Sequence, residues 1–107
     1  MRKYAFPKPG INHTIQKIMI YETKNNGVFL YLYLSQKDIP SHNDLWFEYM
    51  QDAEKFSKAY FHTNEGGWVM IDDPHEGCQD DLIRPIRRCK DNSYKLHEDG
   101  VWKDIEF

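Results

Sequence analysis

Residues 72–81, DDPHEGCQDD, gather several side chains that could do chemistry in ten positions. Half of these residues are acidic, none is basic, and His75 and Cys78 lie in the middle. We call this segment the acidic stretch. Four roles are open to it: a metal site, a catalytic loop, a docking surface for a basic partner, or a solvated turn.

The acidic stretch contains imidazole, thiolate and carboxylate groups, all of which bind metals. However, the chain has no Cys-x-x-Cys and no His-Glu-x-x-His motif. Its acids also do not alternate around a fixed glycine as the ligands of a calcium loop do. We therefore expect no bound metal and no cofactor, and a metal-binding regulator is only a third alternative.

Cys78 is the candidate nucleophile, with His75 as its base. A reactive thiolate needs positive charge nearby, whereas the neighbouring residues in sequence are negative and should raise the pKa of the thiol. We therefore expect no catalytic residue, and a small hydrolase-like enzyme that uses Cys78 with His75 is the alternative function. Cys78 and Cys89 are expected to be reduced thiols, because two cysteines are few for a disulfide-stabilised secreted domain.

The charge pattern favours a docking surface. An acidic patch beside aromatic residues attracts a basic partner and speeds association, and buried tryptophans often anchor interfaces. The predicted partner-binding residues are Asp72, Asp73, Glu76, Asp80, Asp81, Trp46 and Trp68. The alternative is internal pairing of these acids with the basic residues of 84–90, and packing of each tryptophan in the core.

Length and charge limit the class of protein. A chain of 107 residues fits a single domain, and its net charge of −3 is unlike that of a nucleic-acid-binding protein. No apolar run is long enough to span a membrane, and the N-terminal residues do not resemble a signal peptide. We therefore expect a cytoplasmic protein that binds neither nucleic acid nor membrane.

Two helices are predicted from apolar spacing, after an extended N-terminal arm of residues 1–10. Ile11, Ile15, Ile18 and Met19 share one helical face, and that helix would end at residues 25–27, Asn-Asn-Gly. The second helix would run from Ser41 to about residue 61, with Ser41 and Asp44 as a capping box. Its apolar face would hold Leu45, Tyr49, Ala53, Phe56 and Tyr60.

Strands are predicted in four places. Residues 28–34 alternate two sets of apolar side chains and should form a central strand, and residues 68–71 a short one. Residues 82–88 should form an edge strand because Pro85 cannot donate a ladder hydrogen bond. A hairpin about Asp99-Gly100 would place Tyr94 opposite Ile105 and Lys95 opposite Asp104. The predicted fold is α+β, with about four to five antiparallel or mixed strands and two helices packed on them.

The last 40 residues of the chain resemble a block found in small, mostly uncharacterised bacterial proteins. The resemblance rests on Trp68, residues 72–74 (Asp-Asp-Pro), 77–79 (Gly-Cys-Gln) and 85–87 (Pro-Ile-Arg), and on the ending 96–102, Leu-His-Glu-Asp-Gly-Val-Trp. Such proteins resemble the immunity partners of polymorphic or contact-dependent toxins. The resemblance implies a protein of contact-dependent growth inhibition that neutralises a cognate toxin domain in the cytoplasm. Many such toxins are nucleases with basic clefts, which an acidic patch can block. It transfers no catalytic residue.

Overall fold

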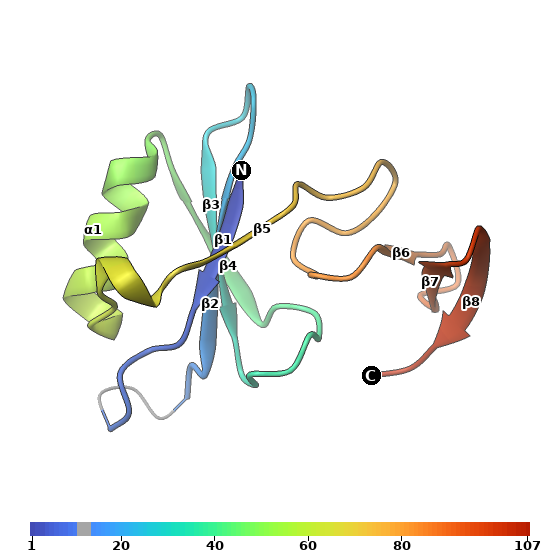
Figure 1. The fold of residues 1–107 in the computed structure, drawn as a ribbon, viewed down its shortest axis with the longest axis horizontal. Coiled ribbons are helices and arrows are strands. Elements are labelled where there is room, and N and C mark those ends of the chain that lie inside the picture. Colours follow the sequence, from blue (N-terminus) through green and yellow to red (C-terminus); the bar gives the residue numbers. More distant parts are fainter. Residues whose placement is uncertain (11–13) are drawn as a thin grey trace.

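The computed structural model describes residues 1–10 and 14–107, and in them the chain forms two antiparallel sheets and one α-helix (Figure 1). The larger sheet has the strand order β4-β3-β2-β1-β5, and the smaller has the order β6-β7-β8. The larger sheet consists of β1 (Arg2–Ala5), β2 (Lys17–Glu22), β3 (Val28–Tyr33), β4 (Asn43–Phe47) and β5 (Val69–Ile71). The remaining elements are α1 (Met50–Phe61), the 3-10 turn η1 (Glu65–Gly67), β6 (Ile86–Arg88), β7 (Tyr94–Glu98) and β8 (Val101–Ile105).

Helix α1 covers one face of the larger sheet, here called the helix face (Figure 1). Side chains alternate along a strand, so every second residue of β2 and β3 points to this face. The core there consists mainly of Ile18, Ile20, Val28, Leu30, Ala53 and Phe61, all of them buried. Burying these apolar side chains is the main contribution to the stability of the sheet and helix.

The opposite face of the sheet is covered by residues 72–85, which we call the connecting loop because it joins β5 to β6 (Figure 1). We call this face the loop face. It is aromatic and basic rather than aliphatic, because cross-strand partners place Lys17 beside Tyr33 and Met19 beside Tyr31. Arg2 projects to the same face from β1, opposite Tyr21. The smaller sheet lies beyond the connecting loop, apart from α1.

The first predicted helix is wrong. Residues 17–22 form β2, the middle strand of the larger sheet, and Ile11 lies outside the described residues. Ile18, Met19 and Ile20 are all fully buried, because β2 is covered on both faces. A continuous apolar run is what such a central strand needs, and its members also satisfy a helical spacing by coincidence.

The second predicted helix is half right. Residues 50–61 form α1, with Ala53 and Phe56 against the core as predicted. Residues 43–47, however, form β4, and the predicted capping box of Ser41 and Asp44 does not exist. The reason is a distant partner, because the Ser41 side chain is hydrogen-bonded to Asp81 instead. The fold is therefore α+β as predicted, but the described residues contain one helix where two were predicted. They also form two antiparallel sheets, of five and three strands, where one sheet of about four to five strands was predicted.

The strand predictions are confirmed in their main features. β3 lies inside the larger sheet, and β5 lies at 69–71. The predicted edge strand at 82–88 is an edge of the smaller sheet, but only residues 86–88 form it, and Pro85 lies in the connecting loop. The hairpin has the predicted register, and Asp99 and Gly100 both have positive φ as a type I′ turn requires. Lys95 Nζ lies 3.5 Å from an Asp104 carboxylate oxygen across the hairpin. The predicted N-terminal arm is extended, and most of its first half is β1, paired between β2 and β5.

The helix α1 is not long and apolar enough to span a membrane, and neither is any other helix in the part of the chain that the structure describes.

Lys17 is a buried cation on the loop face. Only 1% of the residue is exposed, its Nζ donates to the Lys37 carbonyl at 2.8 Å, and it lies 4.2 Å from the centre of the Tyr33 ring. Burial lowers the pKa of Lys17, and the carboxylates of Asp38 and Asp81 offset part of this effect. A buried ammonium whose hydrogen-bond acceptor is a neutral carbonyl is costly to hold in its charged form.

We predict a pH-dependent difference between the wild type and Lys17→Met. Because the pKa of Lys17 is lower in the folded chain than its ordinary value of 10.5, the unfolded chain binds more protons between the two values, and stability rises with pH there. The wild type should therefore gain unfolding free energy relative to Lys17→Met as the pH approaches that value. Urea denaturation of both proteins in the same buffers measures the difference, and the shared tyrosines cancel. Parallel curves would contradict the buried charge.

Candidate partner-binding site

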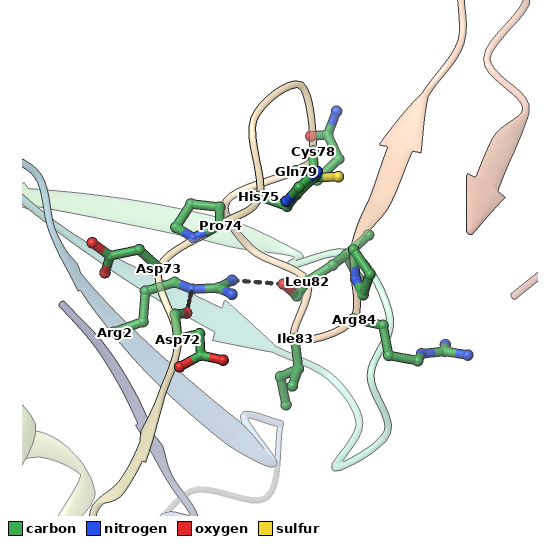
Figure 2. Close-up of a pocket in the computed structure, with 11 residues that line it drawn as sticks. Arg2, Asp72, Asp73, Pro74, His75, Cys78, Gln79, Leu82, Ile83 and Arg84 are labelled. Atoms are coloured by element: carbon green, nitrogen blue, oxygen red, sulfur yellow. Dashed lines mark hydrogen bonds between the residues drawn. The ribbon is translucent and has the colours of Figure 1, made fainter. Parts of the chain in front are cut away.

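The connecting loop is fixed to the sheet by the guanidinium group of Arg2. Its Nε donates to the carbonyl of Asp72 at 2.7 Å, and its Nη1 donates to the carbonyl of Leu82 at 2.6 Å (Figure 2). The Nη1 also donates to the carbonyl of Asp80 at 3.0 Å. Arg2 itself is 3% exposed. One side chain from β1 thus holds both ends of the acidic stretch, and its acceptors are main-chain oxygens rather than carboxylates.

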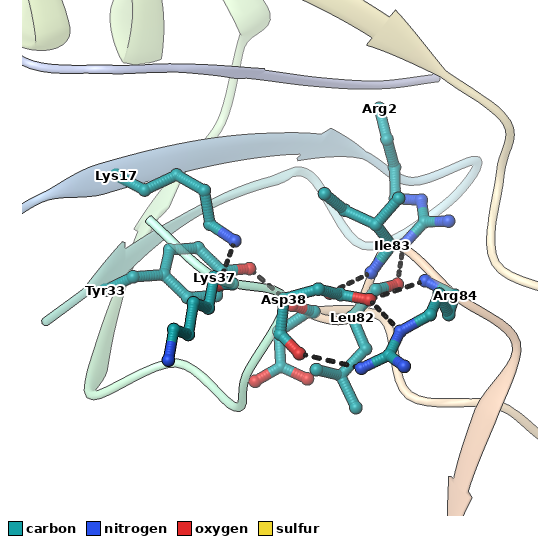
Figure 3. Close-up of polar contacts among 9 residues, drawn as sticks. Arg2, Lys17, Tyr33, Lys37, Asp38, Leu82, Ile83 and Arg84 are labelled. Carbon is teal, nitrogen blue, oxygen red and sulfur yellow. Dashed lines mark hydrogen bonds and ion pairs between the residues drawn. The ribbon is translucent and has the colours of Figure 1, made fainter. Parts of the chain in front are cut away.

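Two further side chains fix the end of the connecting loop. The hydroxyl of Tyr33 donates to the carbonyl of Asp81. The carboxylate of Asp38 accepts from the backbone N–H of Ile83 at 2.7 Å, from the backbone N–H of Arg84 at 3.0 Å and from Arg84 Nε at 2.9 Å (Figure 3). Buried polar groups are stabilised when they are paired in this way, so the loop is held by a connected polar network.

Asp81, one of the predicted docking residues, has a structural role. Its carboxylate accepts from the backbone N–H of Ser41 at 2.9 Å and from the Ser41 hydroxyl at 2.7 Å. Two of its lone pairs are therefore used within the chain, and the residue is only partly exposed. Asp81 can still contribute its charge to a docking surface, but it joins the connecting loop to the segment before β4.

A hollow of about 350 Å³ lies where the acidic stretch meets the sheet, and we call it the acidic hollow. Its lining includes Tyr31, Asp44, Asp80 and Asp81, with Ser41, Cys78 and Gln79. Burial is the largest factor that raises the pKa of Asp80, the charge of Asp81 adds to it, and Arg2 opposes it. Burial also raises the pKa of Tyr31, and the charges of Asp80, Asp81 and Asp44 raise it further. The hollow thus gathers negative charge around an aromatic ring that stacks on Phe29, with ring centroids 6.0 Å apart.

The other three predicted acids are exposed. The side chain of Asp72 is exposed although its carbonyl is used by Arg2, and Glu76 lies at the tip of the acidic stretch. A carboxylate oxygen of Asp73 lies 2.6 Å from the amino group of Met1. Asp72 and Asp73 also line a pocket of about 320 Å³ beneath the acidic stretch (Figure 2).

The two predicted tryptophan anchors lie on opposite faces of the sheet. Trp46 belongs to β4 and shares the loop face with Phe29, its cross-strand partner, and it is 57% exposed. Its Nε1 donates to the carbonyl of Asn26 at 2.6 Å. Trp68 instead packs against the helix-face core, with Lys3 Nζ 4.9 Å from its ring centre. Of the two, only Trp46 lies on the same face as the acidic stretch.

Sequence reasoning missed Asp44 and the paired rings of Phe29 and Tyr31 as members of this surface. A signal for the rings was present, because the alternation in residues 28–34 puts Phe29, Tyr31 and Tyr33 on a face that must be covered by something. No comparable signal marked Asp44, because its place beside Asp80 and Asp81 depends on the long-range pairing of β4 with β3.

The geometry around Cys78 does not favour a nucleophile. The thiol and His75 line the same pocket, yet in the described residues no hydrogen bond joins the Cys78 thiol to the His75 imidazole. Burial raises the pKa of Cys78, and the charges of Arg87 and Arg2 oppose it. The direction agrees with the sequence prediction, but the cause is burial rather than repulsion by the neighbouring acids. His75 stacks on His97 instead, with ring centroids 5.7 Å apart.

Cys78 and Cys89 are both free thiols, as predicted. Residues 1–10 and 14–107 contain no group of three or more histidine, cysteine or acidic side chains arranged to hold a metal ion.

Comparison with protein-family models, with curated proteins and with solved structures finds no match to this chain. What the site could bind must therefore be inferred from its own residues and their geometry.

We predict that Arg2→Met lowers the free energy of unfolding by about 3 kcal/mol, because three main-chain carbonyls lose a charged donor and at least one of them is buried. Arg88→Met is the matched control. Within the described residues, the hydrogen bonds of the Arg88 side chain go to Asn92 at the surface, so its loss should cost about 0.5 kcal/mol or less. Urea denaturation followed by circular dichroism measures both. Equal effects would show that the connecting loop does not depend on Arg2.

Alkylation tests the thiol. In a Cys89→Ser background, the rate of reaction of Cys78 with iodoacetamide should rise with pH to a midpoint above that of a free cysteine, because burial disfavours the thiolate. A midpoint below neutral pH would reverse this interpretation and support the hydrolase-like alternative.

Proposed function

We propose that this chain is an immunity protein that binds and neutralises a bacterial toxin in the cytoplasm, and that it has no catalytic activity of its own. The toxin would be of the polymorphic or contact-dependent kind, and a nuclease fits best because its basic cleft complements an acidic surface. The observation that supports the proposal is the acidic hollow. In it, Asp80 and Asp81 lie on a loop that a buried arginine fixes to the sheet, and they share the hollow with Asp44 of β4 and the ring of Tyr31 on β3.

A fixed loop matters because binding costs conformational entropy. Side chains and loops that become ordered on association each reduce the affinity, whereas a surface that is ordered beforehand does not incur this cost. Arg2 and Tyr33 hold the backbone of the acidic stretch at Asp72, Asp80 and Asp81, and Asp38 holds the backbone of the residues that follow it. Its carboxylates therefore meet a basic partner with their spacing already set.

The part that each acidic side chain would play in binding follows from its position and exposure. Asp80 and Asp44 face the acidic hollow, and Asp72, Asp73 and Glu76 are exposed around it, so all five can attract a basic partner. Long-range attraction raises the association rate, whereas close contacts with Tyr31 and Trp46 would slow dissociation. Trp68 belongs to the core in this scheme and contributes to stability rather than to binding.

The first experiment is co-purification from the host lysate with the tagged protein. The proposal expects a stoichiometric basic domain that is toxic when expressed alone and harmless when this chain is co-expressed. Recovery of a protein that is not toxic, or failure of co-expression to rescue growth, would contradict the immunity function.

We predict that Asp44→Lys/Asp80→Lys slows association with that toxin by about tenfold or more at low salt and weakens the salt dependence of the rate, because both changes act on the acidic hollow. The matched control is Glu48→Lys/Glu65→Lys, which makes the same change in net charge outside the hollow, at two exposed residues that flank α1. Stopped-flow fluorescence at several salt concentrations measures the rates. If the two double variants behave alike, overall charge rather than the hollow governs binding.

A further inference from the structure

The strand β4 forms an open edge of the larger sheet. Within the described residues it pairs only with β3, so one side of its backbone has no strand partner. It has five residues, Asn43 to Phe47, and of these only Asp44 is charged. An exposed edge strand is a template for pairing with another strand, and proteins usually protect such edges with lysine, proline or a bulge.

Exposed aromatic side chains continue this edge onto α1. Phe47 of β4 contacts Phe56 of α1 with ring centroids 5.5 Å apart, and Phe56 stacks on Tyr60 at 4.3 Å. Tyr60 is 62% exposed, and Tyr49, two residues after the end of β4, is 56% exposed. Together with Trp46 on the loop face, these rings place apolar surface on both sides of a strand edge that has no partner strand, which is typical of an interaction site. The backbone N–H of Asp44 donates to the side chain of Asn43 at 2.8 Å, a bond that pairing would exchange for one to the second strand.

We propose that a second copy of this chain pairs with β4, antiparallel, about a two-fold axis that passes through Leu45. The reason for choosing a second copy is that the strand is complementary to itself in this register. Leu45 faces Leu45 of the second copy, Asp44 faces Trp46, and Asn43 faces Phe47. No two like charges lie directly opposite each other, and the exposed ring of Trp46 lies beside Asp44 of the other copy. The two larger sheets then become one continuous ten-stranded sheet.

The other sheet edges are poorer candidates for self-pairing. β5 has only three residues. Its edge cannot extend past Ile71, because the carbonyl of Asp72 accepts from Arg2 and the chain leaves the sheet there. β8 has Lys103 at its centre, which would face Lys103 of a second copy in the equivalent register. Like charges directly opposite each other destabilise a strand pair. β6, the other edge of the smaller sheet, has three residues with Arg87 at their centre, which would face Arg87 of a second copy. β4 is therefore the edge of greatest length without such a barrier.

This dimer goes beyond the proposed immunity function and does not depend on it. Because Asp44 and Trp46 lie on the loop face, pairing of β4 would bring the acidic hollows of the two copies to neighbouring positions on one extended face. The protein would then present two copies of its docking surface side by side, related by the same two-fold axis.

The charge test uses Trp46→Asp. This change places aspartate opposite Asp44 twice in the dimer and removes both exposed indoles, so the dimer dissociation constant should rise by about tenfold or more. The matched control is Met70→Asp at the centre of β5, where the exposed side chain is 60% accessible. Sedimentation velocity over a range of concentrations measures the dimer of each protein, with circular dichroism as the check that each is folded.

A disulfide test stays valid if Trp46→Asp fails to fold. In a Cys78→Ser/Cys89→Ser background, Asp44→Cys/Trp46→Cys should oxidise to a covalent dimer, because facing Cα atoms of an antiparallel pair are about 4.5–5.5 Å apart, within the range of a disulfide. Within one chain these two positions are next-nearest neighbours along an extended strand and are too far apart to bridge readily. Met70→Cys in the same background is the control and should stay monomeric.

The expected result is a wild-type dimer that Trp46→Asp weakens, Met70→Asp leaves intact, and the cysteine pair traps. A wild type that is monomeric at all concentrations would overturn the proposal and leave β4 to a strand of a different protein. A dimer that Met70→Asp disrupts, or that Met70→Cys traps, would also overturn it and move the interface to β5.

Discussion

The hydrogen bonds from the Arg2 guanidinium to three main-chain carbonyls are the constraint on which the loop face depends. These bonds join β1 to residues that lie 70 to 80 positions later in the chain. A buried guanidinium needs acceptors, and neutral carbonyls supply them in fixed positions without using up a carboxylate. Burial lowers the pKa of Arg2, and the nearby charges of Tyr33, Asp73 and Asp80 oppose this effect. The chain thus uses a costly buried cation to set the path of its most acidic segment.

Two carboxylates of the network also hold the connecting loop. Asp38 accepts from two backbone N–H groups and from Arg84, and Asp81 accepts from Ser41, so these two carboxylates hold the loop in place. The remaining acids of the stretch stay available to solvent because the arginine does not pair with them. If Arg2 had instead formed an ion pair with Asp72 or Asp80, the negative charge available to the proposed docking surface would have been reduced. Asp81 is the exception, because its carboxylate both holds the loop and contributes charge to the acidic hollow.

Local sequence patterns predicted the parts of the fold that local physics determines. Asp99-Gly100 determines a hairpin register because both residues accept positive φ, and residues 28–34 alternate two apolar sets as an inner strand does. The first helix failed because Ile18 and Met19 belong to the continuous apolar run of a strand buried on both faces, and with Ile15 they also satisfy a helical spacing. Ser41 failed as a cap because its partner, Asp81, is 40 residues away. Arg2 gave no local signal at all, since its partners are backbone atoms distant in sequence. The sequence identified the acidic stretch as a candidate site. It did not indicate that Asp80 and Asp81, rather than the other acids of the stretch, lie in the hollow with Tyr31.

Native-state hydrogen exchange tests the central claim most directly. The backbone N–H groups of Ser41, Gln79 and Ile83 are bonded to Asp81, to the carbonyl of Ile86 and to Asp38, respectively. If the connecting loop is fixed to the sheet through Arg2 and its network, these amides should exchange nearly as slowly as those of β2 and β3. If they exchange rapidly while the sheet stays protected, the loop opens on its own, and the acidic stretch is not the preorganised surface described above.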